Sequence, residues 1–388
     1  MLLRIENRPR PYDWGSTTAI AQLLGTAPTG GPEAELWFGD HPASPSTIVA
    51  GASEPDLAAH LAARGQKLPF LLKVLAAAEP LSLQAHPTIE QAREGFAREN
   101  AAGVALSDPT RNYKDELHKP ELIYALSDPF IALAGFRPVA AARAELVKAT
   151  EALRSTRLDT FIDRVTSDEA LPDVVRWLIE RGDGVDAVVD AVAEVAHSIE
   201  TLAADSESWE TVRRLARYYP SDPGVALSLL MHTIVLRPGE ALYLPTGNIH
   251  SYQVGLAIEV MAASDNVLRG GLTPKHIDVL ELMRVLDPRP MPEPRIAALE
   301  VSPGVLRFTP DVVDFALTVV SNGAAGNGVT IDSDGFAIVL CLNGELTVQR
   351  SLNLERGQAV YTDESPVRLQ GSGCAVIATG RHPASVTA

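Results

Sequence analysis

A strand-and-turn motif occurs twice in this chain, and the repeat limits the possible folds more than any other feature. The segment Arg237–Tyr243 matches Glu355–Tyr361 over its last five positions, and Gly255–Ile258 matches Gly373–Val376. Both matches are offset by 118 residues, so the spacing inside the motif is the same in each copy. An internal repeat of this kind indicates two related units in one chain. We therefore predict two related β-barrels.

The texture of the sequence divides the chain into three parts. Residues 1–138 and 220–295 carry short apolar runs separated by turn residues, which are typical of strands. Residues 139–219 are rich in Ala, Leu, Glu and Arg, with apolar residues at helical spacing, and predict an all-α insertion of four to six helices. Residues 296–388 return to strands and turns, where Asn343-Gly344 predicts a hairpin. The predicted fold is mainly β with a helical insertion.

Local signals predict several element boundaries. Phe70–Leu75 and Leu81–His86 have the apolar character of strands, and Thr88 is a suitable cap for the helix that follows. A second helix is expected over Thr273–Leu286, capped by its first residue. The Pro-rich run Asp287–Pro294 is typical of a linker.

The charge and composition disfavour several classes of partner. The formal net charge is −16 at pH 7, whereas nucleic acids and anionic membranes favour a basic surface. No stretch of about 20 apolar residues predicts a membrane span, and the first residues are too charged for a signal peptide. Cys341 and Cys374 are too few for a disulfide framework, and buried free thiols are expected. We expect a cytoplasmic protein with no nucleic-acid or membrane partner.

Three separate segments carry residues that could hold a metal. Gln84 and His86 are two apart on an expected strand, so their side chains face the same side. Glu121 opens another apolar run, and His250 follows a Pro-Thr-Gly turn. Each has an ordinary alternative: a polar strand end, a solvated carboxylate, a histidine bonded to turn backbone. Together they supply two imidazoles, a carboxylate and an amide, a set that suits Zn²⁺ at a catalytic site.

A further segment, Ser264–His276, offers a place for an anion. Arg269 precedes two glycines, and Lys275 lies near the helix start expected at Thr273. Glycines let the backbone approach a ligand closely, and helix N-termini favour anions. The two cations would supply positive charge that the acidic chain otherwise lacks. A plain loop-to-helix junction has the same pattern, and that alternative stays open.

A series of longer motifs runs in order along nearly the whole chain. They are Tyr12-Asp13-Trp14-Gly15, Glu35–Gly39 with His41-Pro42, Ser82–Pro87, Asn112–Asp115, His118–Glu121, Gly135–Arg137, Gly247–Tyr252 and Ser264–Lys275. This series resembles the type I phosphomannose isomerases, zinc enzymes of the cupin superfamily. The resemblance implies a discontinuous catalytic cupin (jelly-roll) barrel over residues 1–138 and 220–295. It also implies a helical domain over residues 139–219 and a C-terminal cupin-like barrel over residues 296–388.

The resemblance also implies a metal site and a substrate site. One zinc ion per chain is expected on Gln84, His86, Glu121 and His250. A phosphate site is implied at Ser82, Arg269 and Lys275, and Trp14 is a further expected substrate contact. The implied activity is a metal-dependent aldose–ketose isomerase that interconverts D-mannose 6-phosphate and D-fructose 6-phosphate through a cis-enediol. We expect a monomer that acts on this small-molecule sugar phosphate.

Such a reaction moves a proton between two carbons, so it needs an acid–base group. The candidates are Asp265, Glu259, the pair Lys119 and His118, and a metal-bound water, with Arg269 as a cation near the developing charge. Each could instead support the metal or orient a neighbour.

Two functions from other classes stay open as alternatives. A sugar-phosphate sensor would keep the metal but lack a working acid–base pair. A metal-dependent oxygenase would use two histidines and one carboxylate with Fe(II). The amide of Gln84 and the Arg269–Lys275 segment count against an oxygenase.

Overall fold

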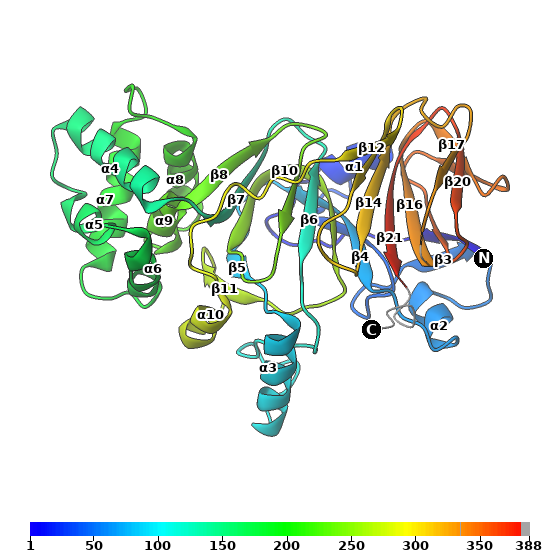
Figure 1. Ribbon diagram of the computed structural model, residues 1–388, viewed down its shortest axis with the longest axis horizontal. Coiled ribbons are helices and arrows are strands. Elements are labelled where there is room, and N and C mark those ends of the chain that lie inside the picture. The colour runs from blue at the N-terminus through cyan, green and yellow to red at the C-terminus, as the bar shows by residue number, and fades with distance from the viewer. Residues whose placement is uncertain (334, 382–388) are drawn as a thin grey trace.

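The protein is mainly β, and the computed structural model describes residues 1–333 and 335–381. Figure 1 shows three regions along the long axis: helices α4 (Val139–Leu153) to α9 (Gly224–Leu227) at one end, a central sheet, and the C-terminal strands at the other end. Helices α3 (Ile89–Ala101) and α10 (Val279–Val285) project from one side of the central sheet. No helix among the described residues is long and apolar enough to cross a membrane.

The central sheet has nine strands, and its longest strand joins most of the others. The strands are β2 (Glu35–Phe38), β4 (Phe70–Ala77), β5 (Leu83–Ala85), β6 (Glu121–Ala125), β7 (Phe130–Phe136), β8 (Met231–Leu236), β9 (Ala241–Leu244), β10 (His250–Ala262) and β11 (Leu268–Gly271). β10 begins against β5 and β7, and from Gly255 onward it pairs with β4. Gly255 has a φ of 124°, and a Cβ there would lie 2.8 Å from Cδ2 of Phe130. Glycine is therefore required where β10 changes partners.

An eight-stranded sheet packs against the central sheet on one face and against a four-stranded sheet on the other. The eight strands are β1 (Leu2–Glu6), β3 (Thr47–Ala50), β12 (Leu299–Ser302), β13 (Val305–Phe308), β14 (Ala316–Val320), β16 (Gly335–Asn343), β19 (Ala359–Thr362) and β21 (Cys374–Arg381); the four are β15 (Val329–Ile331), β17 (Glu345–Val348), β18 (Leu352–Glu355) and β20 (Val367–Gly371). Successive side chains of a strand face opposite ways. Ile338 and Leu340 of β16 accordingly join the core shared with the central sheet, while Val339 and Cys341 join the other core.

The first strand of the chain belongs to the sheet built by the last strands. β1 pairs antiparallel with β19, and Leu3 lies opposite Tyr361. β3 extends the same sheet by pairing with β1. Strands β1 and β3 therefore belong to a sheet that crosses the boundary predicted between the first and last parts of the chain. The division into domains stays a prediction.

The mainly β class is confirmed, whereas the two barrels are not seen as closed sheets. In the described residues, hydrogen bonding leaves all three sheets open at their edges. The predicted hairpin at Asn343-Gly344 is wrong. β16 pairs with β19 and β21, while β17 pairs with β18 and β20, so the turn carries the chain from one sheet to another. Gly344 has a φ of 68° and packs against the backbone of Gly373, where a side chain would collide.

The helix-rich texture of residues 139–219 corresponds to a run of consecutive helices. Between α4 and α9 these are α5 (Asp159–Arg164), a 3-10 turn (Asp168–Ala170), α6 (Leu171–Ile179), α7 (Val185–Ser198) and α8 (Glu207–Tyr218). Their apolar faces form one core that also includes Leu83, Ile249 and Leu268 of the central sheet. The helices thus pack against the part of the central sheet where β5, β10 and β11 meet. Three further short helices are α1 (Ala19–Leu24), α2 (Leu57–Ala62) and a 3-10 turn (Ser228–Leu230).

One predicted helix cap is confirmed and the other is wrong. Thr88 caps α3, since its hydroxyl accepts from the amide of Gln91 in a capping box. The second helix begins at Val279 rather than Thr273, and Asp278 is its cap. The hydroxyl of Thr273 instead accepts from the amide of Lys275, which closes a local turn. A helix terminus therefore does not lie at Thr273.

The Pro-rich run Asp287–Pro294 is attached along its length to the central sheet. The amide of Asp287 donates to the carbonyl of Gly247 at 2.9 Å, and that of Met291 donates to Phe136 at 2.9 Å. The carbonyl of Pro294 accepts from the amide of Tyr243 at 2.9 Å. The run is thus a bound strap and not a free linker. Both cysteines are free as predicted; Cys341 is buried and Cys374 is half-buried.

The repeated motif forms the same turn in both copies. The amide of Arg237 donates to the side chain of Glu240 at 2.8 Å, and the amide of Glu355 donates to that of Gln358 at 3.0 Å. β9 and β19 follow these turns at equivalent positions. The repeat in sequence is therefore a repeat in local structure.

A glycine of α3 provides a test of this packing. Gly95 faces the buried ring of Tyr113, and a Cβ at Gly95 would overlap that ring. Gly95→Ala should lower the free energy of unfolding by about 1–3 kcal/mol because of overpacking, although alanine is ordinarily the better helix former. Ala97→Gly, on the exposed face of α3, should also lower it, by about 1 kcal/mol. Urea titrations measure both, and a stabilised Gly95→Ala variant would contradict the packing.

Candidate metal centre

A buried carboxylate, Glu121, is the centre of the site. It is the first residue of β6 and only 2% exposed. Its Oε1 lies 3.2 Å from Nε2 of His86, and its Oε2 lies 3.3 Å from Nε2 of His250. The ligand atoms of these three residues all lie within 4.8 Å of one another, close enough to share one ion.

Strand pairing brings these residues together from distant parts of the chain. β6 and β10 are neighbours, with Glu121 opposite Met261. His250 begins β10 and lies opposite Gln84 of β5, and His86 follows β5 directly. Directly paired residues of an antiparallel ladder project to the same face. Gln84 therefore lies beside His250, as the sequence predicted, and its role as a ligand stays a prediction.

In both histidines one ring nitrogen contacts a backbone carbonyl, and the other has no hydrogen-bond partner in the described structure. Nδ1 of His86 lies 2.7 Å from the carbonyl of Asn266, and Nδ1 of His250 lies 3.1 Å from the carbonyl of Asn248. A carbonyl can only accept, so these contacts assign the proton to Nδ1 in each ring. Each Nε2 then presents a lone pair, and both are buried without a hydrogen-bond partner in the described structure.

Such an arrangement suits a cation between the two rings and the carboxylate. Two acceptor nitrogens and a carboxylate facing one another have no reason to converge unless a positive ion joins them. Neutral imidazoles whose other nitrogen is held by a carbonyl are the usual form of metal-binding histidines. The donor set of two nitrogens and carboxylate oxygen fits a divalent metal such as zinc.

The charge of Glu121 is secured by its other neighbours. Nζ of Lys119 lies 3.2 Å from Oε1, and the hydroxyl of Tyr252 donates to Oε2 at 3.1 Å. Burial alone would raise the pKa of Glu121, but the positive charge of Lys119 holds it well below its usual value. Burial and Lys119 lower the pKa of His86 to about 4. The site is therefore kept ready to bind a cation at neutral pH.

A second buried charge cluster lies beside the first. Lys73 of β4 is opposite Glu259 of β10, and its Nζ lies 2.8 Å from Oε2 of Glu259. Glu35 lies 3.9 Å from the same Nζ and accepts from the indole of Trp37 at 2.6 Å. Burial would lower the pKa of Lys73, but the surrounding carboxylates raise it, so the ammonium persists. Glu259, a predicted acid–base candidate, is thus an ion-paired side chain that is 3% exposed.

Two other acid–base candidates lie in different surroundings. The carboxylate of Asp265 is half exposed, and its Oδ2 lies 3.0 Å from Nε2 of His41. Burial would raise the pKa of Asp265, but the hydrogen bond from His41 lowers it. His118 is turned toward the C-terminal strands, with its Nε2 2.9 Å from Asp314. Asp265 is therefore an accessible carboxylate, whereas His118 joins two parts of the fold.

The predicted anion-binding cations have no acidic partner. Arg269 lies on β11 opposite Gln84, and Lys275 follows on an exposed turn. In the described part of the chain, neither side chain lies within ion-pair distance of a carboxylate. Burial lowers the pKa of both side chains, and Arg269 lowers that of Lys275 further. Without a carboxylate partner among the described residues, the partly buried Arg269 and the exposed Lys275 are suited to an anionic ligand.

The remaining predicted substrate contacts border the same region. Ser82 is half-buried and directly precedes β5, the strand that carries Gln84. Trp14 is half-buried, packs against the core of the central sheet and stacks on Tyr12 with ring centroids 5.8 Å apart. Their roles toward a substrate stay predictions.

Several residues of the site were not singled out in the sequence. Lys73 has a visible signal, because it interrupts the otherwise apolar run of β4. His41, Tyr252 and Asn266 lie inside motifs noted for their resemblance alone. Their contacts depend on tertiary pairing, which no local pattern reveals.

Known proteins with similar sequences and structures point to one family. Residues 2–139 match the family described as phosphomannose isomerase type I, catalytic domain. The mannose-6-phosphate isomerase of Salmonella typhimurium is 36% identical, over 95% of this chain and 97% of its own length. That of Escherichia coli K12 is 35% identical over the same shares. A zinc-bound crystal structure of mannose 6-phosphate isomerase superposes with a TM-score of 0.85 at 34% identity, covering 98% of this chain and 99% of that one.

The low pKa of His86 predicts how the stability of the metal-free protein depends on pH. The folded pKa is about 4, below the ordinary value near 6.5, so the unfolded chain takes up this proton first as the pH falls. Folding stability should therefore be lost between about pH 6.5 and 4, by up to about 3 kcal/mol from this group. Urea titrations at several pH values measure this, and His86→Gln should flatten the dependence. Equal slopes for the two proteins would contradict the assignment.

Proposed function

The chain belongs to the type I phosphomannose isomerase family, and we propose that it interconverts D-mannose 6-phosphate and D-fructose 6-phosphate using one zinc ion. The observation that carries this proposal is the pair of buried Nε2 atoms, of His86 and His250, that face Glu121 without hydrogen-bond partners. The unpaired cations Arg269 and Lys275 support a phosphorylated substrate. The identity of the sugar is proposed from the names of the relatives, which are mannose-6-phosphate isomerases.

The proposed zinc ligands are Gln84, His86, Glu121 and His250. When bound, zinc supplies a Lewis acid that stabilises negative charge on the substrate oxygens. Lys119 and Tyr252 contact Glu121 and hold its carboxylate ionised and oriented. The carbonyls of Asn266 and Asn248 hold the two imidazoles in the tautomer that a metal requires.

The proposed phosphate contacts are Ser82, Arg269 and Lys275. Arg269 and Ser82 lie next to the metal centre through β5 and β11, which are paired at Gln84 and Arg269. Lys275 lies on the exposed turn that follows β11, and we propose that it contacts the same phosphate. Trp14 is proposed to contact the sugar.

The isomerisation removes a proton from C2 of the open-chain sugar and returns one to C1, with a cis-enediol between the two steps. We assign the transfer to Asp265, because its carboxylate is both ionised and accessible. Glu259 is buried against Lys73, Lys119 is paired with Glu121, and His118 is paired with Asp314. These three are proposed to support the site. Arg269 is placed to stabilise the negative charge of the enediol.

The proposal keeps the architecture inferred from the sequence. It comprises a catalytic cupin barrel over residues 1–138 and 220–295, a helical domain over residues 139–219 and a C-terminal cupin-like barrel. Face-to-face packing of the sheets and the near-complete superposition on a relative support it. The proposed working form is a cytoplasmic monomer.

The other two functions are less well supported. An oxygenase would need open positions beside a two-His-one-carboxylate site, and Gln84, which is paired with His250, is proposed to fill one of them. A sensor has no use for an accessible ionised carboxylate such as Asp265. A coupled assay for fructose 6-phosphate formation distinguishes the isomerase from both.

Removal of the metal tests the catalytic centre. Activity should be lost after chelation and should return when Zn²⁺ is added back, with one zinc per chain by elemental analysis. His250→Ala should lower zinc affinity and turnover by more than about 100-fold, beyond what residues that only support ligands contribute. Its circular dichroism should still report folded C-terminal sheets, since His250 lies in the central sheet. A variant that keeps one zinc and near-normal turnover would show that the ligand assignment is wrong.

Substitution of Lys275 tests the phosphate site. Lys275→Ala should raise KM for mannose 6-phosphate by about 10- to 100-fold, because a charged hydrogen bond contributes roughly 1.5–3 kcal/mol. The kcat should change little, since the phosphate is remote from the reacting carbons. Unphosphorylated mannose, a poor substrate, should be turned over equally by both proteins. A lower kcat with unchanged KM would place Lys275 outside the phosphate site.

A further inference from the structure

Asn266 lies between the proposed base Asp265 and the strand that carries Arg269, and it is fully buried. Its backbone carbonyl accepts the Nδ1 proton of His86 at 2.7 Å. Its side chain does not point toward the metal centre's ligands but bonds to another segment of the chain. One residue thus contacts a metal ligand through its backbone and a distant loop through its amide.

The amide of Asn266 saturates its bonding capacity on this loop, residues 111–117. Its Oδ1 accepts from the backbone amides of Lys114 at 2.7 Å and Asp115 at 3.2 Å. Its Nδ2 donates to the carbonyls of Asp115 at 2.9 Å and Leu117 at 2.8 Å. A buried amide with all these bonds made holds two backbones in one register.

Asp115 closes the connection from the other side. Its Oδ1 accepts from the hydroxyl of Ser264 at 2.8 Å and from the amide of Leu117 at 2.9 Å. Its Oδ2 accepts from the amide of Asp265 at 2.9 Å. The segments 264–266 and 115–117 therefore hold each other through both backbones.

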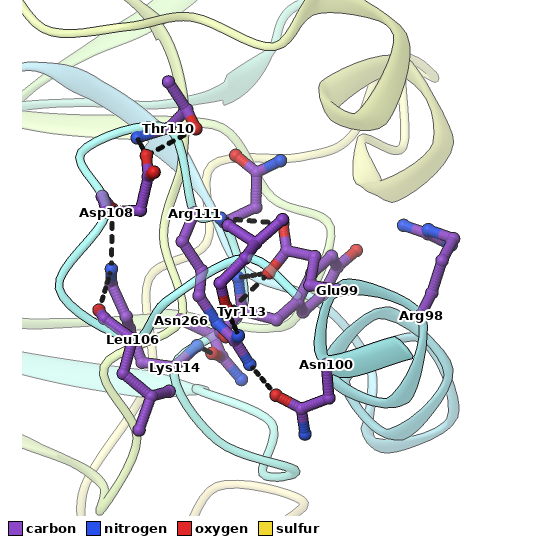
Figure 2. Close-up of polar contacts among 12 residues, drawn as sticks. Arg98, Glu99, Asn100, Leu106, Asp108, Thr110, Arg111, Tyr113, Lys114 and Asn266 are labelled. Atoms are coloured by element: carbon purple, nitrogen blue, oxygen red, sulfur yellow. Dashed lines mark hydrogen bonds and ion pairs between the residues drawn. The ribbon is translucent and has the colours of Figure 1, made fainter. Parts of the chain in front are cut away.

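The loop is itself firmly attached to α3, as Figure 2 shows. Arg111 is buried, and its guanidinium donates to the carbonyls of Tyr113 and Val104 and to the side chain of Asn100. The carboxylate of Glu99 accepts from the amides of Asn112 at 3.0 Å and Tyr113 at 2.9 Å. The loop is a rigid support, and it leads within a few residues to Lys119 and Glu121.

We propose that Asn266 is a positioning residue of the metal centre: its side chain locks its own carbonyl in place, so that His86 is held at a fixed orientation relative to Glu121. This inference rests on the proposed zinc site. The loop that Asn266 grips continues into Glu121, while its carbonyl holds His86. The positions of both Glu121 and His86 therefore depend on the buried side-chain amide of Asn266. Neither Asn266 nor Asp115 contacts the metal itself.

The experiment measures zinc affinity in the full-length protein. Asn266→Ala retains all four proposed ligands and the backbone carbonyl, but it frees the segment from the loop. Competition with a chelator should show zinc affinity lowered by about 10- to 100-fold, the effect typical of residues that orient metal ligands. The visible spectrum of the Co²⁺-substituted variant should also change, which a uniform loss of stability would not produce.

Two further variants make the test decisive. Asn112→Ala is the matched control: its side chain lies on the same loop but donates to Asp278 at 2.9 Å, away from the metal centre. Its zinc affinity and Co²⁺ spectrum should equal those of the parent. Ser264→Ala removes one bond to Asp115 and should lower zinc affinity less than Asn266→Ala does, in the same direction. If Asn266→Ala does not fold, the zinc affinity of Ser264→Ala tests the positioning role instead.

The results separate this inference from the proposed function. A parent protein that binds zinc tightly, together with a folded Asn266→Ala variant of equal affinity and unchanged spectrum, overturns the inference alone. An equal loss in Asn112→Ala also overturns it, because the effect would then belong to the whole loop. A parent that binds no zinc overturns the proposed function and the inference with it.

Discussion

The structure of the site depends on one buried negative charge, the carboxylate of Glu121. A carboxylate removed from water is costly unless cations and hydrogen bonds replace the solvent. Here Lys119, Tyr252 and the two imidazoles of His86 and His250 surround it. The neighbouring buried charges are likewise balanced by opposite charges. Lys73 is in turn balanced by Glu259 and Glu35, so the interior of the central sheet contains a continuous set of paired charges.

The site contrasts with the rest of the molecule in its electrostatics. The chain carries a formal charge of −16, and a uniformly acidic surface would repel a phosphorylated sugar. Arg269 and Lys275 stand apart from this background because no described carboxylate neutralises them. Their positive charge is therefore available to solvent or to a ligand, because it is not neutralised by an ion pair within the described fold. In the proposed function, these two side chains, and not the net charge, select the anionic substrate.

The sequence predicted those parts of the molecule that depend on local patterns. The mainly β class, the helix-rich segment and the cap of Thr88 were correct, since each is encoded within a few residues. The repeat in sequence predicted two barrels, but the structure shows only that its two copies form the same turn. The ligand atoms of His86, Glu121 and His250 lie within 4.8 Å of one another, and their role as metal ligands stays a prediction. The errors concern partners that local patterns cannot identify. Asn343-Gly344 has hairpin chemistry, but the pairing of β17 with β18 and β20 sends the chain to another sheet. Thr273 has a cap's chemistry, but its hydroxyl bonds to the next turn. His41 and Asn266 acquire their roles only through tertiary contacts.

The pairing of β1 with β19 has a consequence for how the chain reaches this structure. Leu3 and Tyr361 are neighbours in space but lie at opposite ends of the polymer. During synthesis the ladder between β1 and β19 cannot form until β19 has emerged from the ribosome, whereas β3 is available much earlier. Contacts of such long range slow folding, because the loop must close before they contribute stability. Removal of the last strands would therefore leave β1 with β3 as its only described partner, so the sheet that contains the amino terminus depends on strands that are made late.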